Sequence, residues 1–220
     1  MELSRKLHKM KQPNLDIKYL ISLPKKYHSN TKWLWPMILY LHGTMTKTND
    51  IDKLKSNGLP KVVSEMEDFP FITVSPLCPF GKIWSDLFDE IKEIILFLRK
   101  EYRISDIYLT GYDMGGHGVW TLASFYPEHF SAIAPVCSDP IQKEKIDSIV
   151  SSLINVSILV YHGRRDRIVP FQEAMEIPEK IREEGGDVNI KLFDNMGHNC
   201  CIRTYTDPEL YEWLISHHKR

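Results

Sequence analysis

Short apolar segments rich in β-branched and aromatic residues alternate along this chain with segments of helical periodicity. Strands are predicted at 16–23, 37–41, 71–75, 107–110, 133–136, 156–161 and 188–193, and helices at 85–99, 115–125, 171–184 and 208–217. Short, mostly apolar strands that alternate with helices pack as a mostly parallel sheet with helices on both faces. Because no linker rich in glycine, proline or serine divides the sequence, we expect residues 1–220 to form a single α/β domain.

Composition narrows the kinds of partner that the chain can have. The 28 lysines and arginines balance 29 acidic residues, for a formal net charge of −1. Since such a chain has no global field to attract polyanions, we expect neither a nucleic acid nor a membrane as partner, but a small-molecule substrate. The four cysteines lack zinc-ligand spacing, so we expect no metal and no other cofactor. Residues 1–13 contain no apolar run typical of a secretory signal, and we expect a cytoplasmic monomer or homodimer.

A sharp turn is predicted where the strand at 107–110 leads into the helix at 115–125. Gly111 and Gly115 flank Asp113 there, in a G-x-D-x-G pattern. In the G-x-S-x-G nucleophile elbow, the central side chain is held out of a strained strand-to-helix turn. The two glycines let crowded backbones pass, and the helix N-terminus supplies a positive dipole. We therefore place Asp113 at the exposed apex of such an elbow.

Two further segments place an acid and a histidine after later strands. Asp166 follows the strand at 156–161, and His198 follows Gly197 after the strand at 188–193. The chain order of elbow residue, acid and histidine is that of the α/β-hydrolases. All three residues follow the carboxyl ends of predicted parallel strands, where such sheets build their sites.

The chain resembles the compact α/β-hydrolases of the dienelactone hydrolase, feruloyl esterase and prolyl-oligopeptidase-like group. The resemblance covers nearly the whole chain and includes the segments ILYLHG, FPFITVSPLCP, IYLTGYDMGGHGVW and VYHGRRDRIVP. It implies the α/β-hydrolase fold and a serine esterase with Asp166 and His198 beside the nucleophile. It also implies an oxyanion hole made by the amides of Met114 and Thr44. The sequence departs from this pattern at Asp113, where the family has serine.

An aspartate at the elbow is compatible with three kinds of function. In the first, a hydrolase acts on a small organic substrate: the carboxylate attacks an sp³ carbon, and His198 then activates water against the resulting ester. In the second, Asp113 and His198 perform cofactor-free acid–base chemistry of the lyase, cyclase or dehydratase type. In the third, an inactive or serine-to-aspartate variant esterase only binds its ligand. We favour the hydrolase.

The candidates for substrate contact are Met45, Trp84 and His117. Met45 belongs to the loop at 44–50, and Trp84 to the segment at 77–87; both follow strand ends and are expected to overhang Asp113. An equal alternative for Trp84 is that it anchors its loop to the core, and for His117 a packing role is favoured. Only residues 137–155 separate two neighbouring strands where related enzymes insert a cap, so we expect no large cap domain and an open cleft.

Overall fold

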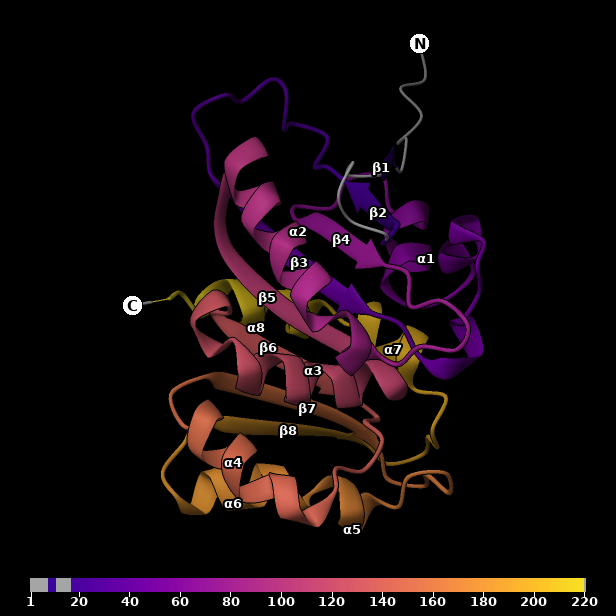
Figure 1. Ribbon diagram of the computed structural model, residues 1–220, viewed down its shortest axis with the longest axis vertical. Helices are drawn as coiled ribbons and strands as arrows, with labels where there is room; N and C mark the ends of the chain where they lie inside the picture. The colour runs from indigo at the N-terminus through magenta and orange to yellow at the C-terminus, as the bar shows by residue number, and fades with distance from the viewer. Residues whose placement is uncertain (1–7, 11–16, 220) are drawn as a thin grey trace.

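One eight-stranded sheet runs through the part of the chain that the computed structural model describes, residues 8–10 and 17–219 (Figure 1). Its spatial order is β1-β2-β4-β3-β5-β6-β7-β8. The strands are β1 (His8–Met10), β2 (Tyr19–Ser22), β3 (Trp35–Leu41), β4 (Ile72–Pro76), β5 (Ile104–Tyr112), β6 (Ala132–Val136), β7 (Ser157–Gly163) and β8 (Val188–Phe193). The β1–β2 and β2–β4 pairs are antiparallel and all others are parallel, which confirms the mostly parallel sheet.

Helices cover both faces of the sheet, as the alternation of apolar segments predicts (Figure 1). One face carries α2 (Phe88–Glu101), α3 (Met114–Phe125), α4 (Lys143–Leu153) and α6 (Glu176–Glu183); the other carries α1 (Gly58–Glu65), α7 (Cys201–Tyr205) and α8 (Pro208–Ser216). Along β3, Met37 and Leu39 belong to the first buried cluster and Ile38 to the second. This period of two is what a strand buried on both sides requires.

Two of the predicted helices are divided in the structure. The segment 85–99 forms a short 3₁₀ turn, η3 (Trp84–Leu87), followed by α2. The segment 171–184, in which Pro178 predicts a kink or a break, is split into α5 (Phe171–Ala174) and α6. The break itself falls at Met175, and Pro178 lies in the first turn of α6, where an absent N–H breaks no helical hydrogen bond.

Helices α1, α4 and α7 were not predicted. Helix α4 is the only regular element between β6 and β7 among the described residues, and its buried Ile146, Ile149 and Val150 pack into the core. The connection therefore packs against the sheet and forms no cap over it. A search of the described residues for a helix long and apolar enough to cross a membrane found none.

Candidate active site

The turn between β5 and α3 holds Asp113 in a strained backbone conformation. Its φ of 60° and ψ of −121° lie outside the regions that non-glycine residues ordinarily occupy. The flanking glycines are required by close backbone contacts. A Cβ on Gly115 would lie 2.0 Å from the carbonyl oxygen of Leu41, and one on Gly111 would lie 2.4 Å from that of Gly115. The G-x-D-x-G spacing is thus explained by this turn.

The carboxylate of Asp113 occupies two functional positions at once. Its Oδ2 accepts a hydrogen bond of 2.7 Å from the amide of Thr44, and the amide of Met114 also donates to the carboxylate. Its Oδ1 lies 3.3 Å from Nε2 of His198. The two amides that the resemblance implies as an oxyanion hole therefore both donate to the carboxylate of the elbow residue itself.

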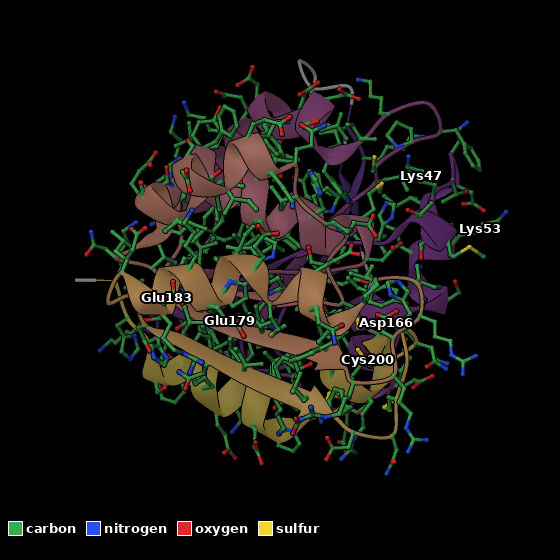
Figure 2. The ribbon with its side chains drawn as sticks, turned by 90° about the horizontal axis from the view of Figure 1, so that it is seen from below. Lys47, Lys53, Asp166, Glu179, Glu183 and Cys200 are labelled. Carbon is green, nitrogen blue, oxygen red and sulfur yellow. The ribbon has the colours of Figure 1, made fainter. Side chains whose placement is uncertain are left out.

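His198 is held between two carboxylates. Its Nδ1 is 2.8 Å from Oδ2 of Asp166, and its Nε2 faces Asp113. The side chain of Asp166 is fully buried, and its Oδ1 accepts hydrogen bonds of 2.9 Å from the amides of Ile168 and Val169. Asp166 and Cys200, two residues beyond His198, lie at the end of the sheet to which the strand arrows point (Figure 2). The structure thus brings Asp113, Asp166 and His198 together.

The charges in this group stabilise one another. Burial opposes ionisation of Asp113, but hydrogen bonds from His198, Thr44 and Met114 outweigh it and lower the pKa of Asp113 to about 2. Burial likewise opposes the imidazolium, but its hydrogen bonds to Asp113 and Asp166 prevail and raise the pKa of His198 to about 9. At neutral pH the free site therefore contains an ionised Asp113 beside a protonated His198.

Asp139 is a site residue that the sequence reasoning missed. It lies just after β6, its amide donates to the carbonyl oxygen of Asp113 at 3.3 Å, and its carboxyl group interacts with that of Asp113. Burial and the charge of Asp113 raise the pKa of Asp139 to about 6. The loop after β6 has no motif. Because β6 pairs with β5 in parallel, however, the residues that follow β6 lie beside the elbow that follows β5, and this pairing is the signal that could have identified Asp139.

A cavity of about 520 Å³ begins at Asp139 and Ser138 and extends between α4 and α6. Trp120 and Ile141 also line it, whereas Asp113 and His198 do not. These last two side chains keep only 13% and 12% of their surface exposed. Asp139 is therefore the residue that connects the elbow to this space.

The three candidates for substrate contact have different surroundings. Met45 is 93% exposed, beside the Thr44 amide. Trp84 is 2% exposed, and its Nε1 donates to the carbonyl oxygen of His42 at 3.0 Å, so its position fits the anchoring role rather than a pocket wall. Nδ1 of His117 is 3.2 Å from the carbonyl oxygen of Pro140, which holds this ring against the loop after β6.

One group of potential metal ligands lies behind the histidine. Ligand atoms of the buried Cys137, His162 and Asp166 lie within 4.8 Å of one another. Both oxygens of Asp166 are already bonded, one to main-chain amides and one to His198. A hydrogen bond to a neighbouring thiol and burial raise the pKa of Cys137, so its thiol is protonated rather than a ligand thiolate. Hydrogen bonding accounts for this cluster, and we assign it no metal.

The strand order, the elbow and the residues beyond β7 and β8 define an α/β-hydrolase fold. The sequence pattern of the dienelactone hydrolase family matches residues 80–208, which include Asp113, Asp166 and His198. The chain belongs to the dienelactone hydrolase family.

Solved structures and a curated relative agree with this assignment. A thermostable esterase superposes with a TM-score of 0.76 at 26% identity over 96% of this chain, which spans only 62% of the length of that esterase. A ferulic acid esterase of similar fold has a TM-score of 0.64 at 20% identity, with 90% of each chain covered. A protein of Aquifex aeolicus (strain VF5) named "Putative carboxymethylenebutenolidase" is 22% identical over 192 residues, 78% of this chain and 79% of its own.

Proposed function

We propose that this chain is a hydrolase that acts on a small organic substrate through a covalent ester between Asp113 and an sp³ carbon. The observation that carries the proposal is that the two oxygens of Asp113 have different partners. Oδ2 accepts a hydrogen bond from the Thr44 amide, and the Met114 amide also donates to the carboxylate, whereas Oδ1 faces His198. An ester formed at Oδ1 would already have its carbonyl oxygen, Oδ2, in the oxyanion hole.

The proposed reaction has two steps. In the first, Oδ1 of the ionised Asp113 attacks carbon and the leaving group departs; the carboxylate needs no base for this. Alkylation removes the negative charge of Asp113, which is one of the two supports of the imidazolium of His198. His198 can then lose its proton and, held by Asp166, activate water for attack on Cγ. The amides of Thr44 and Met114 stabilise the oxyanion that forms on Oδ2.

Ordinary ester hydrolysis is a poorer fit to this site. An acyl substrate needs the oxyanion hole for its own carbonyl oxygen, and in this chain Oδ2 of Asp113 fills the hole. Attack of Asp113 on an ester would also form an anhydride, a less favourable intermediate than the acyl ester of a serine. For these reasons we propose an electrophilic sp³ carbon as the reacting atom.

The ester is expected to accumulate when the second step is blocked. The His198→Asn protein, mixed with epoxides, haloalkanes, lactones and esters, should gain the mass of one alkyl group from an sp³ electrophile, as measured by intact mass spectrometry. The adduct should map to the peptide that contains Asp113 and be absent from the Asp113→Asn/His198→Asn protein. The absence of an adduct with every electrophile would contradict the proposal.

A second candidate is acid–base catalysis without a covalent bond, in a lyase, cyclase or dehydratase. The observation that favours it is the imidazolium of His198 between Asp113 and Asp166, since such a pair can both donate and accept a proton. The same adduct experiment separates the candidates. Turnover by the wild-type protein of a substrate that leaves no adduct on the His198→Asn protein would favour acid–base catalysis.

A further inference from the structure

The carboxyl groups of Asp139 and Asp113 interact with each other. Because two carboxylates repel each other and both groups are partly buried, the interaction favours the neutral form of one of them. The amide of Asp139 also donates to the carbonyl oxygen of Asp113 at 3.3 Å, which fixes the loop after β6 against the elbow. The pair is thus part of the architecture of the turn.

Since the pKa of Asp139 is raised to about 6 and that of Asp113 is lowered to about 2, the proton of this pair resides on Asp139 at mildly acidic pH. Asp113 already accepts hydrogen bonds from Thr44, Met114 and His198, all of which favour its ionised form. For Asp139, burial and the neighbouring charge of Asp113 are the largest influences, and both favour its neutral form. Asp139 therefore presents an acidic proton beside the proposed nucleophile and at the edge of the cavity that Ser138 and Trp120 line.

Building on the ester proposed at Asp113, we infer that Asp139 is the general acid that protonates a departing oxygen, and that the substrate class is epoxides. A halide or a carboxylate leaves as a stable anion and needs no proton. The alkoxide formed when an epoxide opens does need one, and the ring strain of an epoxide makes its carbon reactive toward a carboxylate. A cavity of about 520 Å³ next to Asp139 is of ordinary size for a small-molecule site.

In the proposed epoxide reaction, an ester of Asp113 forms and is then hydrolysed. The bond from Oδ1 of Asp113 to carbon forms, the C–O bond of the epoxide breaks, and the new alkoxide takes the proton of Asp139. His198 passes its proton to the carboxylate of Asp139 and becomes a base. It then removes a proton from water as the water oxygen bonds to Cγ. When the tetrahedral intermediate collapses, the bond from Cγ to the alkylated oxygen breaks, and that oxygen takes the proton from His198. Asp113, left protonated, returns its proton to His198, and the product is a diol.

The test compares two electrophiles that differ in their need for a proton. The rate of adduct formation on the His198→Asn protein is measured by mass spectrometry with 1,2-epoxybutane and with 1-iodobutane. When Asp139→Asn is combined with His198→Asn, alkylation by the epoxide should become about 100-fold slower or more, because general acids contribute at least that much. The rate of alkylation by iodobutane should change by less than about threefold. Circular dichroism and thermal unfolding establish that each variant is folded.

Asp187→Asn is the matched control, because it makes the same substitution at an exposed side chain before β8, at the end of the sheet opposite the site. The Asp187 side chain is 55% exposed and pairs with His217, so neither rate should change by more than about threefold. Alkylation by the epoxide should also fall as pH rises and Asp139 ionises, while alkylation by iodobutane stays constant because Asp113 remains ionised throughout. The titratable groups around Asp139 are Asp113, Asp166, His198 and His117, and the charged residues that line the same cavity are Lys143, Glu173, Glu176 and Glu179. Since the positive charge of His198 lowers the pKa of Asp139, the His198→Asn background moves this fall above pH 6.

The outcomes separate this inference from the proposed function. If Asp139→Asn slows alkylation by both electrophiles equally, the inference is overturned, because Asp139 then only positions Asp113. An unchanged epoxide rate, or an adduct from iodobutane alone, overturns it as well and leaves the ester at Asp113 standing. If neither electrophile forms an adduct, the proposed function is overturned, and the inference with it.

Discussion

Asp113→Ser is expected to hydrolyse p-nitrophenyl acetate about 10³-fold faster than Asp113→Ala, because the serine variant regains a complete triad. Removal of the Asp113 carboxylate frees the Thr44 and Met114 amides for the acyl oxygen of the substrate. His198, still oriented by Asp166 at 2.8 Å, can then act as the base for the new hydroxyl. The measurement is the steady-state rate of p-nitrophenol release from the two purified variants.

The wild-type protein serves as the second comparison in this assay. Because the Thr44 amide binds its own carboxylate oxygen, it should hydrolyse the ester no faster than Asp113→Ala. A folded serine variant with no advantage over the alanine variant would mean that the acid, the histidine and the amides are not assembled for acyl transfer.

The parts of the site that sequence predicts are those with a backbone requirement or a fixed place in the fold. Gly111 and Gly115 predict the elbow because a side chain at either position would clash with the neighbouring backbone. Asp166 and His198 each follow a strand end, and parallel strands bring their carboxyl ends to one edge. What the sequence could not predict is that the Thr44 amide donates a hydrogen bond to the carboxylate of Asp113, since this depends on the path of the loop at Thr44.

Trp84→Ala is expected to lower the free energy of unfolding by about 3–5 kcal/mol, as for other buried aromatic residues. Trp84 is 2% exposed, and its ring packs edge-on against His42 with centroids 5.0 Å apart. A Cβ on Gly118 of α3 would come within 3.0 Å of the indole, so the helix packs closely on this side chain. Urea unfolding followed by circular dichroism measures the effect.

Trp33→Ala is the matched control, because Trp33 is 58% exposed. Its loss should change the free energy of unfolding by no more than about 0.5 kcal/mol, which is typical of surface substitutions. Equal effects of the two substitutions would show that Trp84 does not anchor the segment after β4 to the core.

The elements and residues that sequence analysis missed have physical explanations. Helix α4 has a buried stripe of Ile146, Ile149 and Val150, but it begins with the charged residues 143–145. Such a charged run is typical of a solvated surface segment and does not by itself predict a helix. Asp139 follows no motif, and its role depends on a carboxyl partner supplied by the neighbouring strand. Burial of Trp84 depends on how closely α3 approaches β3, a tertiary property that local patterns do not contain.

The most direct test of the ester at Asp113 is a single turnover in H₂¹⁸O. Wild-type protein in excess over 1,2-epoxybutane or 1-iodobutane is allowed one turnover, and the product and the peptide that contains Asp113 are then analysed by mass spectrometry. Because water attacks Cγ of the ester, ¹⁸O should appear in Asp113, and the new hydroxyl of the product should carry the ¹⁶O that came from Asp113. Product that carries ¹⁸O, formed while Asp113 stays unlabelled, would mean that water attacks the substrate directly and would contradict the ester mechanism.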